Sequence, residues 1–263
     1  MNESVREPAV AGAFYPASRA ALGALVTRLL DAARTAEKRP LPKAIVAPHA
    51  GYVYSGPIAA SAFALLEPYA ESIERVVLVG PAHRVRVEGL ASPGAAALRT
   101  PLGDVVVDTA ALASIDVVAS PAAHAREHSL EVELPFLQVV APRARVVPLA
   151  VGRAGADEVA RVLEALWGGR ETVIVVSSDL SHYLPYDEGR AADERTAARI
   201  VALDGAPLEG EDACGCAGIN GLVRVARAKG MRAELVDLRS SGDTAGTRGE
   251  VVGYGAFGFW EAS

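Results

Sequence analysis

Three histidines each follow an apolar run that has the length and composition of a buried strand. The runs cover residues 44–47, 75–82 and 172–176, and the histidines that follow them are His49, His83 and His182. Short apolar runs bounded by turn residues are typical of strands inside a sheet. Because ligands of open α/β sheets bind beyond the carboxyl ends of the strands, this spacing predicts that the three imidazoles share one site.

A site with several imidazoles is a candidate metal site, because neutral imidazole is the commonest metal ligand in proteins. Thiolates and carboxylates often complete such sets. Cys214 lies shortly before an apolar helical segment at residues 219–229, and the positive end of a helix favours the thiolate. The competing interpretation is a buried, unreactive cysteine. The second cysteine, Cys216, lies two residues further on, where a helix would turn its side chain away from Cys214.

Asp179 precedes His182 by three residues, in the turn that follows the third apolar run. Its carboxylate can bind a metal, accept a proton or orient a neighbouring imidazole, and it can also cap the turn that follows. His128 lies in a second histidine-bearing turn. Because imidazoles exchange protons near neutral pH, we predict catalytic roles in acid–base chemistry or substrate orientation for His128, Asp179 and His182.

Two other kinds of chemistry find less support in the motifs. The stretch from Ser177 to His182 has the residue types of a serine hydrolase, but the chain has no G-x-S-x-G nucleophile elbow. It also has no G-x-x-x-x-G-K-[ST] loop, which argues against nucleotide binding by that route.

The composition fits a globular protein without a nucleic-acid surface. The chain has 263 residues, of which 51% are apolar, and its formal net charge is -6 without a long run of like charge. No apolar run approaches the roughly 20 residues that span a bilayer, and the first residues do not resemble a signal peptide. We therefore expect a cytoplasmic protein that binds neither nucleic acid nor membrane.

The elements that position these residues read as an alternation of strands and helices. This order predicts a single α/β domain over residues 1–263, with a mixed, largely parallel sheet and helices on both faces. Helices are expected after Ser18 and Ser55, and Pro135 is expected to bend or delay a third. Pro148 lies inside an apolar run and predicts an edge strand or a bulge.

Several short stretches also match known sequence motifs in a fixed order. They are Arg6 to Pro16, Ala47 to Tyr52, Gly80 to His83, Glu127 to Glu131, Val176 to Tyr183, Cys214-Gly215 and Val251 to Gly255. Each motif alone is weak, but the ordered set spans nearly the whole chain. In this set the chain resembles the Memo family, called AmmeMemoRadiSam system protein B in bacteria and archaea.

The resemblance implies a fold like that of the class III extradiol dioxygenases, which are non-haem iron enzymes. It implies an iron or copper ion held at positions that match His49, His83 and Cys214, and a cleft also lined by His128, Asp179 and His182. Zinc would also suit a site with a thiolate. The resemblance further implies association with a radical-SAM protein. The animal member of the family is described as a redox and signalling mediator that engages phosphotyrosine-containing receptor segments.

Three functions remain open from the sequence. The first is a metal-dependent redox enzyme acting on a small molecule. Non-haem iron oxygenases use two histidines and a carboxylate, whereas Cys214 is the third candidate here, so ring cleavage is not implied together with the fold. The second is a metal-dependent hydrolase in which Asp179 or His128 is the base. The third is a non-catalytic module that binds a peptide or phospho-ligand.

Overall fold

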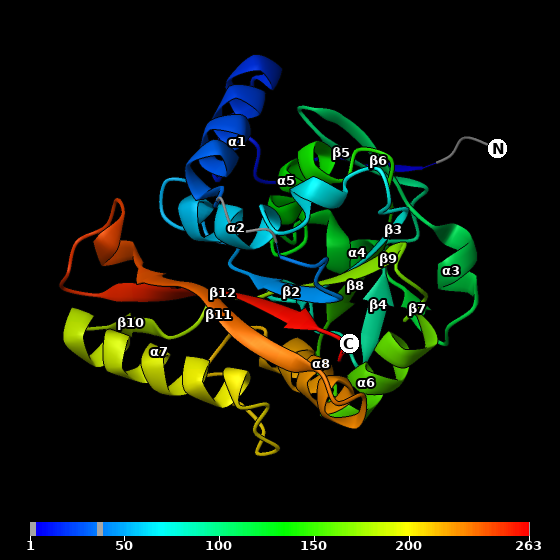
Figure 1. Ribbon diagram of the computed structural model, residues 1–263. Coiled ribbons are helices and arrows are strands. Elements are labelled where there is room, and N and C mark those ends of the chain that lie inside the picture. Colours follow the sequence, from blue (N-terminus) through cyan, green and yellow to red (C-terminus); the bar gives the residue numbers. More distant parts are fainter. Residues whose placement is uncertain (1–3, 36–38, 263) are drawn as a thin grey trace.

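A nine-stranded sheet forms the centre of the molecule (Figure 1). The computed structural model describes residues 4–35 and 39–262. Within these residues the strands are β1 (Val5–Arg6), β2 (Ala44–Ala47), β3 (Arg75–Pro81), β4 (Leu90–Ser92), β5 (Ala97–Thr100), β6 (Gly103–Val106), β7 (Val118–Ala119), β8 (Arg145–Val151), β9 (Thr172–Ser177), β10 (His182–Leu184), β11 (Arg232–Ser240) and β12 (Val251–Trp260). The helices are α1 (Arg19–Ala33), α2 (Gly56–Phe63), α3 (Thr109–Ala113), α4 (Pro121–Ala125), α5 (Leu134–Val140), α6 (Ala156–Ala165), α7 (Tyr186–Val201) and α8 (Cys216–Ala228), with short 3-10 helices η1 (Glu67–Tyr69), η2 (Glu131–Glu133) and η3 (Ser241–Asp243).

The sheet has a parallel centre and antiparallel flanks. Its strand order is β10-β12-β2-β9-β3-β8-β4-β7, with β11 paired to β12. Strands β2, β9, β3 and β8 run parallel to one another, whereas β12 is antiparallel to β2 and β4 is antiparallel to β8. A separate three-stranded sheet has the order β1-β5-β6. The predicted mixed α/β architecture is therefore confirmed, and β9 lies between the two strands that precede His49 and His83.

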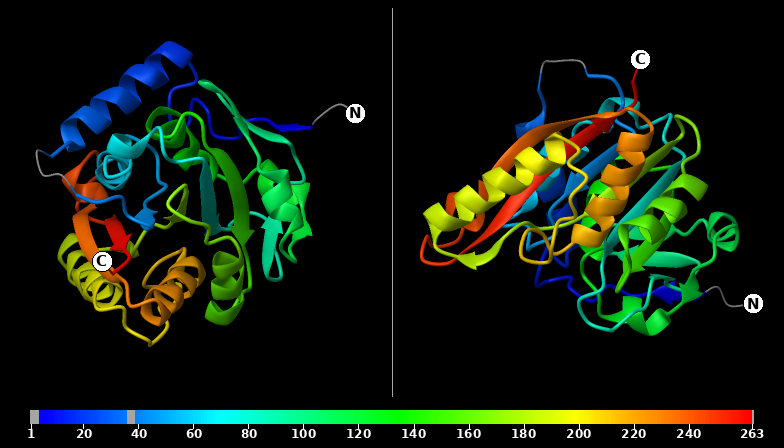
Figure 2. Two further views of the ribbon diagram at one scale, coloured as in Figure 1. Left: turned by 45° about the vertical axis from the view of Figure 1, so that its right-hand side comes forward. Right: turned by 90° about the horizontal axis from the view of Figure 1, so that it is seen from below.

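Two apolar cores cover the two faces of the sheet. Side chains alternate along a strand, so that Ile45 of β2 packs in the core with α1, α2 and α5, while its neighbours Ala44 and Val46 pack in the core with α6, α7 and α8. Figure 1 shows these helices on opposite sides of the strands, and Figure 2 shows α7 and α8 in front of the sheet when it is seen from below. Burial on both faces explains why the central strands read as continuous apolar runs.

The predicted helix starts are largely confirmed. Ser18 caps α1 by accepting a hydrogen bond from the backbone N–H of Ala21, and α2 begins at Gly56 with Pro57 in its first turn. The helix that contains Pro135 starts late, because η2 precedes it and α5 begins only at Leu134.

The edge-strand or bulge interpretation of Pro148 is wrong. Strand β8 pairs with β3 over its whole length without a register shift, and β4 joins its other side at Ala150 and Val151. Pro148 is tolerated because it falls in a gap on the side of β8 that faces away from β3. On that side the isolated bridge to Val107 lies at Val146, and the pairing with β4 begins only at Ala150. At Pro148 itself, no strand pairing falls on the side away from β3 among the described residues.

One glycine pattern in β12 has the spacing G-x-G-x-x-G, at Gly253, Gly255 and Gly258. It lies inside a strand paired with β11 and β2, so it does not form the turn before a helix that phosphate binding requires. No helix within the described ranges is long and apolar enough to cross a membrane.

Candidate metal centre

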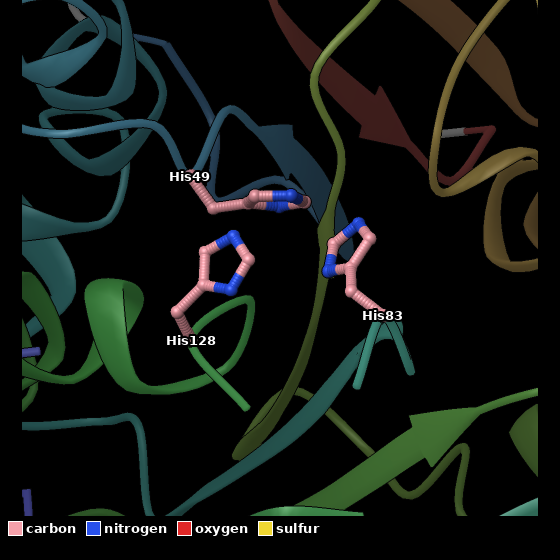
Figure 3. A group of neighbouring side chains, drawn as sticks. All are labelled: His49, His83 and His128. Carbon is pink, nitrogen blue, oxygen red and sulfur yellow. The ribbon is translucent and has the colours of Figure 1, made fainter. Parts of the chain in front are cut away.

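Three imidazoles meet beyond the carboxyl ends of the central strands (Figure 3). His49 follows β2, His83 follows β3, and His128 comes from the turn between α4 and η2. The ring centroids lie 5.3 Å apart for His49 and His83, 5.5 Å for His49 and His128, and 4.9 Å for His83 and His128. One ring nitrogen from each lies within 4.8 Å of the other two. The prediction that the strand ends bring His49 and His83 together is confirmed, and His128 completes a group that can hold one metal ion.

A single carboxylate, that of Glu127, orients two of the three rings. Its Oε1 atom lies 3.0 Å from Nδ1 of His83 and 3.2 Å from Nδ1 of His128. Both oxygens also accept backbone N–H groups, from His83 and Arg84 on one side and from His128 and Ser129 on the other. Although burial opposes it, the approach of the two imidazoles and these N–H groups hold the pKa of Glu127 well below its usual range. Glu127 is therefore a buried anion that faces the Nδ1 atoms.

His49 is oriented from a different direction. The residue is 2% exposed, and its Nδ1 lies 2.7 Å from Oγ of Ser177, the last residue of β9. Burial, followed by the charges of His83 and His128, holds the pKa of His49 well below its usual range. The ring is therefore neutral, which is the form that binds a metal. Since Nδ1 of His49 and Nδ1 of His83 contact Ser177 and Glu127, their Nε2 atoms remain for a shared ion. Nδ1 of His128 lies 3.2 Å from Oε1 of Glu127 but has no hydrogen-bond partner among the described residues.

Cys214 brings a sulfur atom to the edge of this group. Its Sγ lies 3.4 Å from Nε2 of His49 and 3.3 Å from the backbone nitrogen of Asp179. The chain passes close to β9 here, because a Cβ atom on Gly215 would lie 2.6 Å from the carbonyl oxygen of Ser177. The expected start of a helix just after Cys214 is confirmed, since α8 begins two residues later.

The expected thiolate at Cys214 is not what this environment favours. Burial is the largest effect on the thiol, and together with the nearby Asp179 carboxylate it raises the pKa of Cys214 far above its usual value. A metal bound at this sulfur would have to displace the thiol proton. Cys216, in the first turn of α8, packs instead against the apolar core beneath that helix.

Asp179 is buried directly after β9 and supports the backbone of the first histidine. Its Oδ1 accepts a hydrogen bond of 2.8 Å from the backbone N–H of His49. Burial raises the pKa of this carboxyl, against the effects of that hydrogen bond and of the nearby histidines. The carboxylate therefore supports the turn that carries His49 and does not cap a helix.

His182 lies outside the three-histidine group and begins β10 rather than closing a turn. Its charge still lowers the pKa values of His49 and Asp179, so it lies within electrostatic range of the site. The remaining histidine, His124, is buried elsewhere, with its Nε2 2.9 Å from the carbonyl oxygen of Ala91. The catalytic roles predicted for His128, Asp179 and His182 stay predictions.

The N-terminal residues 5–15, which we call the N-terminal strap, hold the turn that carries His128. Buried Glu131 accepts hydrogen bonds from the backbone N–H groups of Ala9 and Val10. It also pairs with the Arg6 guanidinium and accepts the Tyr15 hydroxyl proton. The strap ends beside the site, where the ring of Phe14 lies 4.9 Å from the His128 ring.

Sequence reasoning missed three side chains that surround the imidazoles. Glu127 and Ser177 lie within the motifs that resemble the Memo family, but the sequence provided no reason to assign either of them a role at the site. Ser177 was considered only as part of a serine-hydrolase site, which the missing nucleophile elbow argued against. Nothing in the sequence predicted that Glu133 is buried near the site, since glutamates in this stretch are typical of the exposed start of a helix. All three are buried in the structure.

Comparisons with known proteins agree on one family. The sequence model of the family described as Memo-like protein matches residues 6–257. The chain is similar to a MEMO1 family protein of Archaeoglobus fulgidus, with 37% identity over 272 residues that cover 97% of this chain and 99% of that protein. It is also similar to MEMO1 family proteins of Methanopyrus kandleri, with 36% identity covering 97% and 98% of the two chains, and of Aquifex aeolicus, with 37% identity covering 95% and 97%.

Proposed function

Since the chain belongs to the Memo-like protein family, we propose that it is a metal-dependent oxidoreductase with one iron or copper ion in the three-histidine site. The observation that carries the proposal is the convergence of His49, His83 and His128 within 4.8 Å. Cys214 lies close enough to His49 to bind the same ion. The proposed donors are thus three imidazoles and one thiolate, a set that includes the expected His49, His83 and Cys214.

The donor types fit a redox metal. Imidazole and thiolate ligands suit copper and iron, as well as zinc. Within the described ranges neither a carboxylate oxygen nor Sγ of Cys214 belongs to the three-histidine group, and Cys214 is included for its distance of 3.4 Å to Nε2 of His49. The set therefore differs from the two-histidine, one-carboxylate site of the non-haem iron oxygenases, and we do not propose ring cleavage. When bound, iron or copper would supply one-electron chemistry to a small-molecule substrate.

The surrounding residues would manage protons and geometry. Glu127 and Ser177 orient the rings, and Asp179 supports the backbone of His49. Because burial raises the pKa of Asp179, this carboxyl can hold a proton beside the site. His182, at the start of β10, is the second candidate for proton transfer.

The proposal is tested with protein purified without chelator. Metal analysis and anomalous scattering should find one ion among the three imidazoles, and oxygen uptake or superoxide production should depend on it. His83→Ala should lose the ion, whereas His182→Ala should keep the ion and lose turnover. Protein that binds no iron or copper, or that keeps the ion after His83→Ala, would contradict the proposal.

A zinc-dependent hydrolase is the second candidate. Three imidazoles that leave coordination positions open are also typical of catalytic zinc, which activates a bound water. Bound zinc, hydrolysis of a small ester or amide and absence of oxygen consumption would favour it. If the ion supported neither reaction, we would propose the three-histidine site as a binding site for a peptide or phospho-ligand, and a radical-SAM protein would be the partner to test first.

A further inference from the structure

The hydroxyl of Ser177 has three polar neighbours and is fully buried. Its Oγ lies 2.7 Å from Nδ1 of His49, 2.7 Å from the carbonyl oxygen of Ser129 and 2.8 Å from Oε1 of Glu133. His49 follows β2, whereas Ser129 and Glu133 both come from the stretch between α4 and α5. This hydroxyl therefore links the first metal-site histidine to a glutamate in η2.

Counting protons around this oxygen leaves one consistent arrangement. A hydroxyl donates one hydrogen bond and accepts two. The Ser129 carbonyl can only accept, so it must take the Ser177 proton. The other two neighbours must then donate, which places a proton on Nδ1 of His49 and another on the Glu133 carboxyl. Any other arrangement would share the single Ser177 proton between two oxygen atoms or set two lone pairs against each other.

The surroundings of Glu133 agree with this count. The residue is 0% exposed, and its second oxygen has no hydrogen-bond partner. No ion pair is found for it within the described residues. An ionised carboxylate in such a place carries a large desolvation penalty, and burial accordingly raises the pKa of Glu133 well above its usual value. Glu133 is a neutral acid that donates to Ser177.

We propose that Ser177, backed by neutral Glu133, is a positioning residue that holds His49 as the Nδ1–H tautomer and so reserves Nε2 for the metal. A competing tautomer is available on the other side of the ring. With the proton on Nε2, His49 would donate to the sulfur of Cys214, which lies 3.4 Å away. Ser177 and Cys214 thus compete for one imidazole proton, and only the Ser177 arrangement leaves a lone pair toward the shared site.

The tautomer can be read directly in the metal-free protein. In ¹⁵N-histidine-labelled protein, the ¹⁵N shifts and two-bond proton couplings of His49 should show Nδ1–H in the wild type. Ser177→Ala removes the acceptor, so part or all of the population should move to Nε2–H. Glu133→Gln should keep Nδ1–H, because its amide N–H can still donate to Ser177. Ser92→Ala, at a buried serine outside the site, is the control and should change nothing.

The effect on metal binding rests on the proposed function and is measured separately. With Zn²⁺ as the probe, Ser177→Ala should bind 10- to 100-fold more weakly, the usual range for loss of a group that orients a metal ligand. Glu133→Gln should stay near wild type. An infrared band of a protonated carboxyl at neutral pH should disappear in Glu133→Gln.

Three results would overturn the inference: Nε2–H in the wild type, an unchanged tautomer in Ser177→Ala, or no protonated-carboxyl band from Glu133. A wild type that shows Nδ1–H but binds no metal would contradict the proposed function and leave the tautomer assignment standing.

Discussion

The same substitution, glutamate to glutamine, should have opposite consequences at two buried positions that lie six residues apart. Glu127→Gln should destabilise the fold and weaken metal binding, whereas Glu133→Gln should not destabilise the fold at pH 7. The reason is that the Glu127 carboxylate accepts N–H groups, whereas the neutral Glu133 proposed above would donate to Oγ of Ser177, 2.8 Å away. An amide retains the donor function of a neutral acid but cannot replace a carboxylate that is surrounded by N–H groups.

The magnitude at Glu127 follows from its contacts. One oxygen accepts the backbone N–H groups of His83 and Arg84, at 2.5 and 3.2 Å. The other accepts those of His128 and Ser129, at 2.8 and 3.1 Å. Whichever oxygen the amide nitrogen replaces, two N–H groups lose their acceptor. Each unsatisfied buried group costs about 1–3 kcal/mol, so the expected loss is about 2–6 kcal/mol. That is a large part of the roughly 5–15 kcal/mol that stabilises a typical domain.

The pH dependence separates the two residues further. The pKa of Glu127 is depressed in the folded state. Its contribution to the stability of the fold is therefore fully present above pH 4.5, the ordinary pKa of a glutamate, and is lost as the pH falls below 4.5. The pKa of Glu133 is raised, so its contribution is present below 4.5 and is lost as the pH rises toward the folded pKa. Above 4.5 the stability of Glu133→Gln relative to the wild type should therefore increase, by about 1.4 kcal/mol per pH unit for one proton.

The assay is urea unfolding of the wild type and both variants between pH 4 and 8, with Zn²⁺ affinity measured on the folded proteins. Glu127→Gln should lose least stability at the acid end and bind Zn²⁺ about 10- to 100-fold more weakly at neutral pH. Equal losses in the two variants at pH 7, or a stability difference for Glu133→Gln that does not change with pH, would refute the assignment of one glutamate as an anion and the other as a neutral acid.

Three further results are expected. Zn²⁺ should protect Cys214 and not Cys216 from alkylation, as read by mass spectrometry; protection of Cys216 alone would show that the wrong sulfur has been assigned to the site. Glu131→Gln should loosen the N-terminal strap, which hydrogen exchange would report as faster exchange at the amide of Val10 with β9 unaffected; unchanged exchange would mean that other contacts hold the strap. Asp179→Asn should keep the ion, because the amide oxygen can still accept the His49 N–H, and should lower metal-dependent oxygen uptake by about 10²-fold or more; unaltered uptake would remove Asp179 from proton transfer.

The fold was largely predictable because its determinants are local or periodic. The apolar runs before His49 and His83 mark strands buried on both faces, and the Ser18 cap marks the start of α1. Pro148 was misread because proline constrains pairing only at its own position, and pairing with β4 begins two residues later. Where neighbouring strands begin and end is set by tertiary packing, which a single sequence does not display.

The histidines of the candidate site could be predicted from the sequence, but the glutamates beside them could not. Histidines that follow strands can be located from sequence, because the strand ends of a parallel sheet meet at one edge. Whether a glutamate is exposed or buried depends on partners that lie far away along the chain. The side chain of Glu127 contacts His83, which lies 44 positions away in the sequence. The side chain of Glu133 contacts Ser177, which also lies 44 positions away. Neither contact leaves a periodic or compositional mark.

Three buried glutamates lie between residues 127 and 133, in and just after the turn that bears His128. Through them this segment contributes as much to the site as the strand ends do. Glu127 is an anion that orients two imidazoles, Glu131 anchors the N-terminal strap, and Glu133 is a neutral donor that reaches His49 through Ser177. A strand end fixes where a histidine backbone lies but leaves its ring free to rotate and to exchange its proton between two nitrogens. The segment of the three glutamates restricts the rotation of these rings and the position of their protons. It brings one carboxylate to the Nδ1 atoms of His83 and His128 and, through Ser177, would set the tautomer of His49, where ring nitrogens of the three histidines lie within 4.8 Å of one another.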